Sequence, residues 1–242
     1  MKTIIIIPAR MASTRFPNKP LALIEGIPMV QRVWKQAIKS GIGEVIVACS
    51  EIEVFNLIES LGGKAVMTDP ELPSGTDRVF EVLKNHSEGH LFDSIINLQG
   101  DMPIIDPNDI KKVNIPLIQG FDIGTLVTDI SIEEEKNINI TKANVRWIKK
   151  NYIGESLDFY KLSKNSIKNI YHHVGIYSFT FQSLKKFVSL DQSPNEVSQK
   201  LEQLRALDAK MSIGANYTKE IPLSVDTEAD LIKVENIIRS KN

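Results

Sequence analysis

Short apolar runs alternate with amphipathic stretches through the first half of the chain. The pattern predicts strands at residues 3–8, 45–48, 65–67, 95–98 and 123–127, with helices at 29–39, 54–60 and 77–84. Strands that are apolar at successive positions, joined by helices, are typical of a mostly parallel sheet covered on both faces. Ligands bind such sheets beyond the carboxyl ends of the strands. We therefore expect an α/β fold with its site at that edge.

The pattern changes between about residues 131 and 169. This stretch is polar, holds the alternating segment NVRWI, and predicts a small strand-containing insertion in a single domain that covers residues 1–242. After it, HHVGIYSF predicts a strand and residues 195–210 predict one helix. The apolar positions of that helix are Val197, Leu201, Leu204 and Leu207. A last helix follows Thr227, which would cap it together with Asp230.

Composition excludes several classes of protein. The chain has 29 Lys and Arg residues against 30 Asp and Glu, so its formal charge of -1 gives no general affinity for nucleic acid or anionic membranes. No apolar stretch approaches a membrane span, and the first apolar run is too short for a secretory signal. Cys49 is the single cysteine, so no internal disulfide can form. These features predict a cytoplasmic protein without membrane insertion or a nucleic-acid partner.

A cationic loop follows the first predicted strand. Arg10, Arg15 and Lys19 are separated by turn-forming residues, which makes a helix there unfavourable. A triphosphate needs fixed cations and nearby backbone donors, and small residues such as Ser13 let the backbone approach phosphate. Asn18 tolerates the left-handed backbone that such a turn often needs. The segment therefore predicts a polyphosphate site, although it lacks the Walker A pattern of P-loop proteins.

Two carboxylates are placed at the same predicted edge. Asp101 follows Gly100 directly after the strand at residues 95–98, and Asp226 precedes the last helix. Each alone is most simply a turn or cap residue. Together, beside a cationic loop, they favour a Mg²⁺ site, because Mg²⁺ is held by one or two carboxylates and by substrate phosphates.

Six segments together resemble one known family. In chain order they are IPARMASTRFPNKP, VMTDPELPSGTDR, NLQGDMP, HHVGIYSF, KLEQLRAL and VDTEADL. The chain resembles the 3-deoxy-manno-octulosonate (Kdo) cytidylyltransferases over nearly its whole length, least between residues 131 and 169. The resemblance implies a three-layer nucleotide-diphosphosugar transferase fold and the reaction of CTP with Kdo to give CMP-Kdo and pyrophosphate, as lipopolysaccharide assembly requires.

The resemblance also implies roles for individual residues. Lys19, Asp101 and Asp226 would be catalytic, with the two aspartates holding Mg²⁺. The nucleotide would contact Arg10, Ser13, Arg15, Lys19, Ser74, Thr76 and Arg78. The sugar would contact Arg78, Gln99, His173, Tyr177, Glu202 and Gln203. The family and the insertion, which carries Trp147 on a predicted edge strand, together indicate a homodimer.

Three departures from the family pattern leave the sugar open. Met102 stands where members commonly have Glu, Gln199 replaces an acidic residue, and a usual Ser-Arg pair has no counterpart within residues 156–169, where Lys161 or Lys164 could substitute. Alternatives are therefore a cytidylyltransferase for 8-amino-Kdo or a nonulosonic acid, and a non-catalytic nucleotide-binding protein of the same fold. The opening loop does not match the spacing usual in enzymes for sialic-type sugars.

Overall fold

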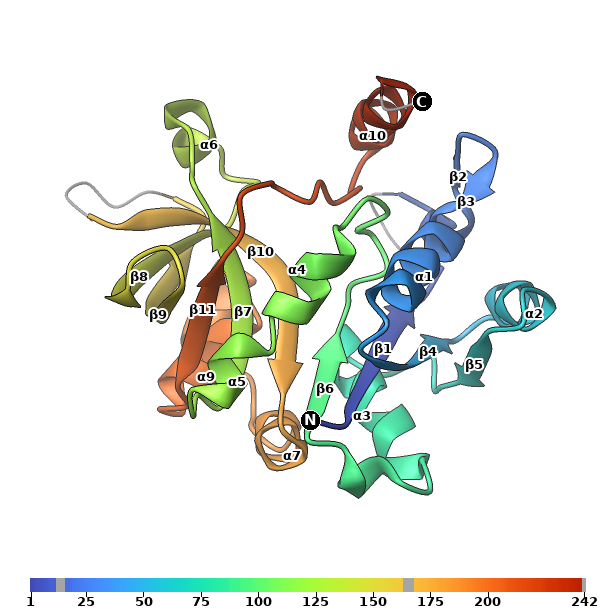
Figure 1. Cartoon of the computed structure of the whole chain (residues 1–242), viewed down its shortest axis with the longest axis horizontal. Helices are drawn as coiled ribbons and strands as arrows, with labels where there is room; N and C mark the ends of the chain where they lie inside the picture. The colour runs from blue at the N-terminus through green and yellow to red at the C-terminus, as the bar shows by residue number, and fades with distance from the viewer. Residues whose placement is uncertain (12–15, 163–167, 241–242) are drawn as a thin grey trace. The chain divides into compact units, whose positions relative to one another are not determined.

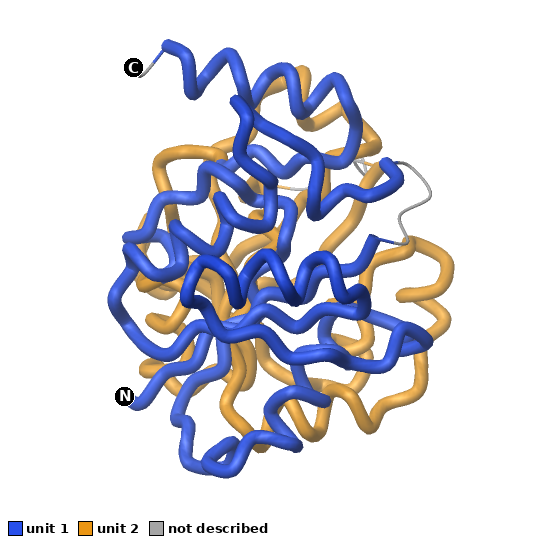
Figure 2. Tube along the Cα trace, turned by 90° about the vertical axis from the view of Figure 1, so that its right-hand side faces the viewer, with its two compact units in different colours: residues 1–110, 222–242 blue, residues 111–221 orange. Residues whose placement is uncertain are grey.

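The computed structural model describes residues 1–11, 16–162 and 168–240. The chain forms two compact units: unit 1 comprises residues 1–110 and 222–242, and unit 2 comprises residues 111–221 (Figure 2). The boundary falls within helix α4 (Pro107–Lys112). The single domain expected from the sequence stays a prediction. Within the described residues, no helix has the length and apolar character that crossing a membrane requires.

Unit 1 is built on a parallel sheet. Its strands are β1 (Thr3–Ala9), β4 (Gly43–Cys49), β5 (Lys64–Met67) and β6 (Ser94–Asn97) (Figure 1). They pair in the order β5-β4-β1-β6, and every pair is parallel. Ile4 to Ile7 are all fully buried. Because successive side chains of a strand point to opposite faces, both faces of β1 are covered, as the apolar runs predict.

Three helices supply that cover in unit 1. They are α1 (Met29–Ser40), α2 (Ile52–Ser60) and α3 (Gly75–Asn85). Helix α1 contacts β1 and β4, α2 contacts β4 and β5, and α3 contacts β1, β4 and β6. The buried apolar positions of α1, which are Met29, Val30, Val33 and Ala37, follow helical spacing. The helix ends at Gly41, whose φ of 64° is the left-handed conformation that favours glycine.

The end of the chain returns to unit 1. Helix α10 (Glu228–Ser240) packs near the hairpin of β2 (Leu23–Ile24) and β3 (Ile27–Pro28). Thr227 caps α10 together with Asp230, as predicted: the Thr227 amide donates to the Asp230 carboxylate at 3.1 Å. The cluster that fixes this return contains Ile24, Met29, Val225 and Val234, all fully buried. This cluster therefore joins residues near the start of the chain to residues near its end, more than 190 positions away.

Unit 2 is a mixed sheet whose strand pairings close on themselves. Its strands are β7 (Ile123–Thr128), β8 (Lys142–Lys149), β9 (Ile153–Tyr160), β10 (Ile170–Phe179) and β11 (Ile213–Tyr217). Strand β7 pairs with β11 in parallel, and the β11–β9, β9–β8, β8–β10 and β10–β7 pairs are antiparallel. The parallel sheet expected from the sequence is therefore found in unit 1, whereas the sheet of unit 2 is mixed, since only its β7–β11 pair is parallel among the described pairs.

Short helices complete unit 2. They are α5 (Ile115–Ile118), α6 (Ile132–Lys136), α7 (Phe181–Val188), α8 (Pro194–Gln199) and α9 (Gln203–Asp208). The region 131–169 holds α6, β8 and β9, so the prediction that it contains strands is confirmed. Strand β8 is only partly an edge: Lys142 to Asn144 also pair with β10, whereas Trp147 pairs with β9 alone.

The single helix predicted over residues 195–210 is wrong. The segment forms α8 and α9, and Lys200 between them has a left-handed backbone with φ of 54°. Leu201 and Leu204 are buried as expected, but Val197 is 58% exposed and Leu207 is only half-buried. With the chain broken here, Glu196 and Arg205 form a buried ion pair that one straight helix could not make.

Candidate active site

Lys19 lies between two carboxylates in unit 1. Its Nζ donates to Asp101 Oδ2 at 2.7 Å and to Asp226 Oδ1 at 2.9 Å. The Lys19 side chain is 14% exposed, and those of Asp101 and Asp226 are 24% and 38% exposed. The three residues predicted to be catalytic thus meet, although they are 82 and 207 positions apart. This is a charged cluster open to solvent at the end of the parallel sheet.

Local geometry places Asp101 and Asp226 in this cluster. A Cβ on Gly100 would come within 2.8 Å of the Pro8 carbonyl oxygen, so only glycine allows the chain to leave β6 so close to β1. The Val225 amide donates to the Asp101 carbonyl oxygen at 2.9 Å. Val225 is itself buried in the cluster under α10. The last segment of the chain is therefore bonded directly to the turn that carries Asp101.

The electrostatics of Lys19 follow from its two partners. Burial alone would lower the pKa of Lys19, but Asp101 and Asp226 outweigh it and raise the pKa above its ordinary value. The ammonium group is therefore charged at any physiological pH. Asn18, just before the short 3-10 helix η1 (Lys19–Leu21), has φ 56° and ψ 24°, so its predicted left-handed backbone is confirmed. That turn brings Lys19 back toward the edge of the sheet.

Two arginines predicted to bind the nucleotide differ in their surroundings. Arg10 is exposed directly after β1. Arg78 on α3 is only 2% exposed, and its Nη1 donates to the Thr68 hydroxyl. Among the described residues, Nη2 of Arg78 has no hydrogen-bond partner. Ser13 and Arg15 lie outside the described residues, so their roles stay predictions.

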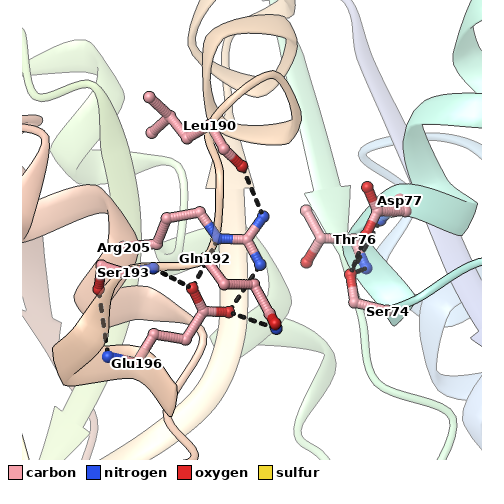
Figure 3. A network of polar contacts seen from close by, with 8 residues as sticks. All are labelled: Ser74, Thr76, Asp77, Leu190, Gln192, Ser193, Glu196 and Arg205. Carbon is pink, nitrogen blue, oxygen red and sulfur yellow. Dashed lines mark hydrogen bonds and ion pairs between the residues drawn. The ribbon is translucent and has the colours of Figure 1, made fainter.

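The SGTDR segment begins helix α3. Ser74 caps this helix: its hydroxyl accepts from the amides of Thr76 and Asp77, both at 3.1 Å, and donates to the Asp77 carboxylate at 2.7 Å (Figure 3). Thr76 is buried and accepts from Asn97 Nδ2 at 3.1 Å, and the Asn97 side-chain oxygen accepts from Gln99 Nε2 at 2.9 Å. A chain of polar contacts therefore links the start of α3 to the end of β6. The contacts of these residues with a ligand stay predictions.

The other predicted sugar residues belong to unit 2. His173 and Tyr177 lie on β10 with their ring centroids 5.5 Å apart. Burial lowers the pKa of His173 to about 3, and burial together with Glu202 raises the pKa of Tyr177. His173 is therefore neutral and Tyr177 keeps its proton at neutral pH. Glu202 stands immediately before α9, whose first residue is the buried Gln203.

The donor set of unit 1 fits Mg²⁺. Asp101 and Asp226 supply hard carboxylate oxygens that a single ammonium group already bridges, so a small cation can reach both. The described residues contain no group of three or more His, Cys, Asp or Glu arranged to hold a metal. At sites with one or two carboxylates, Mg²⁺ usually completes its coordination with water and substrate phosphates. The arrangement therefore suits a metal that arrives with a nucleotide.

Comparison with known proteins identifies the family. Residues 4–213 match the family model described as cytidylyltransferase. The chain is 45% identical over 240 residues to a 3-deoxy-manno-octulosonate cytidylyltransferase of Paramagnetospirillum magneticum, covering 98% of both chains. It is also 45% identical over 234 residues to that of Parvibaculum lavamentivorans, covering 95% of this chain and 90% of the relative. The chain belongs to the 3-deoxy-manno-octulosonate cytidylyltransferase family.

Solved structures extend this assignment to the fold. The chain is similar to CMP:2-keto-3-deoxy-manno-octonic acid synthetase complexed with CTP, at 33% identity and a TM-score of 0.88, with all of both chains covered. It also shares its fold with UDP-glucose pyrophosphorylase complexed with UDP-glucose, at 14% identity and a TM-score of 0.70 over all of both chains. The predicted nucleotidyltransferase-type α/β fold is confirmed, and the chain is an enzyme of the nucleotidyltransferase class.

The sequence did not reveal two buried charged groups in this cytidylyltransferase. Arg205 is bonded to Glu196 at 2.6 Å, with both side chains less than one-tenth exposed. Lys142 is fully buried, and its Nζ donates to the carbonyl oxygens of Asn137 and Lys161, each at 2.6 Å. Arg205 falls within the LEQLRAL segment, one of the six on which the family resemblance rests, so its importance was in part indicated by the sequence. Lys142 stands in a polar stretch typical of an exposed surface, and nothing in the sequence indicated its burial. A replacement of the Ser-Arg pair by Lys161 stays a prediction, and Lys164 lies outside the described residues.

Proposed function

We propose that this cytidylyltransferase transfers CMP from CTP to the anomeric hydroxyl of Kdo, releasing pyrophosphate, in the cytoplasm and for lipopolysaccharide assembly. The observation that carries the proposal is the contact of Lys19 with both Asp101 and Asp226 at the carboxyl edge of the parallel sheet. The 33% identical relative that was solved with CTP supports the choice of nucleotide. The 45% identical relatives support the choice of sugar.

The reaction needs positioning and charge neutralisation more than covalent chemistry. The anomeric hydroxyl must attack the α-phosphorus in line while pyrophosphate departs, and no side-chain nucleophile is required. Lys19 Nζ has three N–H donors, two of which go to the aspartates. The third can donate to a phosphate oxygen, and exposed Arg10 lies on the same loop. These cations would stabilise the charge that moves onto the leaving pyrophosphate.

Mg²⁺ is the proposed cofactor, held by Asp101 and Asp226. When bound, it would supply Lewis-acid stabilisation of the α-phosphate and lower the pKa of the attacking hydroxyl. Lys19 would keep both carboxylates oriented, since its ammonium group already bonds to each. Arg78 would offer its buried Nη2–H groups to the nucleotide or the sugar.

A substrate panel tests the proposed reaction. Purified protein is given CTP, Mg²⁺ and one of Kdo, 8-amino-Kdo or N-acetylneuraminate, and pyrophosphate release is followed to obtain kcat/KM. We expect Kdo to be the best substrate. If Kdo is used no faster than N-acetylneuraminate, the sugar assignment is wrong. If kcat/KM for 8-amino-Kdo exceeds that for Kdo by orders of magnitude, 8-amino-Kdo is the substrate, and the three departures from the family pattern, at Met102, Gln199 and the Ser-Arg pair, are the sequence features that indicated it. Absence of pyrophosphate release with every sugar would favour the non-catalytic alternative.

Lys19→Ala should weaken the use of CTP selectively. A charge-assisted hydrogen bond is worth about 1.5–3 kcal/mol, so kcat/KM for CTP should fall by about tenfold to a hundredfold. Arg15→Ala is expected to act in the same direction. The matched control is Lys149→Ala, because Lys149 is an exposed cation on β8. Initial rates at varied CTP measure the effect, and equal losses in all three variants would argue against a phosphate role for the loop.

We also propose a homodimer in which the region 131–169 forms contacts. Ile148 on β8 is 70% exposed and Leu157 on β9 is 45% exposed, so apolar side chains face solvent in this hairpin. Trp147 is not among them, because its Nε1 donates to the Tyr171 hydroxyl at 2.8 Å within unit 2. Light scattering should give twice the monomer mass of 27.2 kDa at micromolar concentration. Ile148→Asp should shift the mass toward the monomer, whereas a monomer mass for the unchanged protein would refute the dimer.

A further inference from the structure

The Thr125 hydroxyl lies beside an irregular stretch of β10. In the pairing of β10 with β7, Val174 lies opposite Leu126, but the next pair joins Tyr177 to Thr125, so Gly175 and Ile176 have no partner on β7. Backbone groups at such a bulge lose their ladder hydrogen bonds and need other partners. The fully buried Thr125 Oγ1 lies 2.9 Å from the Ile176 carbonyl oxygen and 3.2 Å from that of Val174.

The same hydroxyl contacts His173. Thr125 Oγ1 lies 3.0 Å from His173 Nε2. A hydroxyl has one hydrogen, and carbonyl oxygens can only accept, so the Thr125 hydrogen goes to one of the two carbonyl oxygens at the bulge, of which that of Ile176 is the nearer. The lone pairs of Oγ1 then face Nε2, which must therefore carry the hydrogen and donate it. If Thr125 instead donated to Nε2, two buried carbonyl groups would face an oxygen lone pair at hydrogen-bond distance.

The remaining ring nitrogen of His173 is therefore an acceptor. Burial lowers the pKa of His173 to about 3, so the ring is neutral and only one nitrogen is protonated. Phe159 holds the ring from one side, with centroids 4.9 Å apart at an interplanar angle of 72°, and Tyr177 lies 5.5 Å away. Nδ1 has no hydrogen-bond partner in the part of the chain that the structure describes.

We propose that Thr125 is a positioning residue that fixes His173 in the Nε2-protonated tautomer, so that Nδ1 accepts a hydrogen bond from a hydroxyl group of the sugar. The proposal rests on the proposed function, which gives His173 its place in the sugar site. An unprotonated Nδ1 repels a carboxylate, so His173 selects a hydroxyl and leaves the acid group of the sugar to the cationic side chains. Thr125 thereby sets which part of the sugar His173 recognises.

Imidazole ¹⁵N spectra of labelled protein test the tautomer directly. The chain has four histidines, and His173→Asn assigns the signal of interest by its loss. We expect unchanged protein and Thr125→Ser to show a protonated Nε2 and an unprotonated Nδ1. Thr125→Val has nearly the same shape but no acceptor for Nε2–H, so the proton should move partly or fully to Nδ1. Ser178→Ala is the matched control, because it removes a buried hydroxyl on β10 that, like that of Thr125, bonds a carbonyl oxygen, here that of Val113.

Kinetics connect the tautomer to the sugar. Thr125→Val should raise KM for Kdo by about tenfold or more and leave KM for CTP within about twofold, because a buried polar group loses its partner. Thr125→Ser and Ser178→Ala should keep KM for Kdo within about threefold of the unchanged protein. A purely structural role for Thr125 would raise both KM values together or neither.

The outcomes separate this proposal from the proposed function. An Nδ1-protonated His173 in the unchanged protein overturns the proposal, even if Thr125→Val fails to fold. A changed tautomer in Thr125→Val with an unchanged KM for Kdo also overturns it. If the unchanged protein shows the expected tautomer but does not use Kdo, the proposed function fails, and the same KM comparison with the sugar that is used decides the role of Thr125.

Discussion

Asp101→Asn is expected to lower kcat for CMP transfer by at least about a hundredfold, and Asp226→Asn is expected to do the same. Metal stabilisation of the transition state is worth several kcal/mol, and each 1.36 kcal/mol corresponds to a factor of ten in rate. Asparagine keeps the shape of aspartate but loses the negative charge that would hold Mg²⁺. Pyrophosphate release at saturating CTP and Kdo measures the loss.

The fold should survive both substitutions. The Asp101 and Asp226 side chains are 24% and 38% exposed, so solvent screens their contact with Lys19. Either variant also leaves Lys19 with one remaining carboxylate. We therefore expect the free energy of unfolding to change by less than about 1 kcal/mol, as urea denaturation would show.

A matched control separates metal binding from general charge. Glu228→Gln replaces an exposed carboxylate in the first turn of α10, two residues from Asp226, and should leave kcat within about twofold. Magnesium titration gives a second readout, because a lost ligand should raise the Mg²⁺ concentration needed for half-maximal rate. A folded Asp101→Asn or Asp226→Asn variant with near-normal kcat and Mg²⁺ dependence would remove that residue from the site.

Sequence reasoning predicted the parts of the site that follow local rules. The strand at Ile4 to Ile7 is buried on both faces, and an apolar run predicts that directly. The turn at Asn18 needs a left-handed residue, which its residue type indicates. Asp101 follows a glycine at the end of a strand. Each of these depends on neighbours within a few residues.

What could not be predicted depends on residues far apart in the chain. The sequence indicated that Asp226 belongs to this edge, but no local pattern encodes the bond of Val225 to Asp101 that holds Asp226 near Lys19. Burial of Lys142 depends on carbonyl oxygens from two different segments. The bulge opposite Thr125 appears only when β7 and β10 are paired. The apolar spacing over residues 195–210 predicted one helix, but it does not encode a contact that only a broken helix can make.

That contact is the ion pair of Glu196 with Arg205. In one continuous helix these residues, nine positions apart, would lie about 13 Å apart along the axis and on opposite faces. The break at Lys200 lets the two side chains meet: Arg205 Nε donates to Glu196 Oε2 at 2.8 Å and Nη2 donates to Oε1 at 2.6 Å (Figure 3). The pair thus joins α8 to α9, the helix that begins at Gln203 directly after Glu202.

Further contacts satisfy both charges of the pair. The Ser193 amide donates to Glu196 Oε2 at 3.2 Å, and Arg205 Nη1 donates to the Leu190 carbonyl oxygen at 3.4 Å (Figure 3). The Arg205 guanidinium also lies 5.1 Å from the centroid of the Phe187 ring. Burial alone would raise the pKa of Glu196, but the hydrogen bonds and charge of Arg205 outweigh it and lower the pKa.

Glu196→Gln and Arg205→Met are each expected to lower the free energy of unfolding by about 3–5 kcal/mol, because each leaves a buried charge without its partner. The double variant Glu196→Leu with Arg205→Met should recover much of that loss, since it buries no charge. Urea denaturation followed by circular dichroism measures all three. The matched control is Glu155→Gln, which breaks the exposed pair with Arg146 and should cost less than about 1 kcal/mol.

The pH dependence of the free energy of unfolding is an independent test of the same ion pair. Because the folded state lowers the pKa of Glu196, its stabilisation is fully present above the ordinary glutamate pKa of 4.5 and is lost as the pH falls below that value. Glu196→Gln removes this contribution, so the stabilities of the variant and the unchanged protein should converge as the pH falls from 6 to 3. Two results would contradict this role of the ion pair: a single variant that loses less than about 1 kcal/mol of unfolding free energy at pH 7, or a difference in stability between Glu196→Gln and the unchanged protein that stays constant down to pH 3. Either result would mean that the packing of Leu201 and Leu204, and not the ion pair, maintains the break at Lys200.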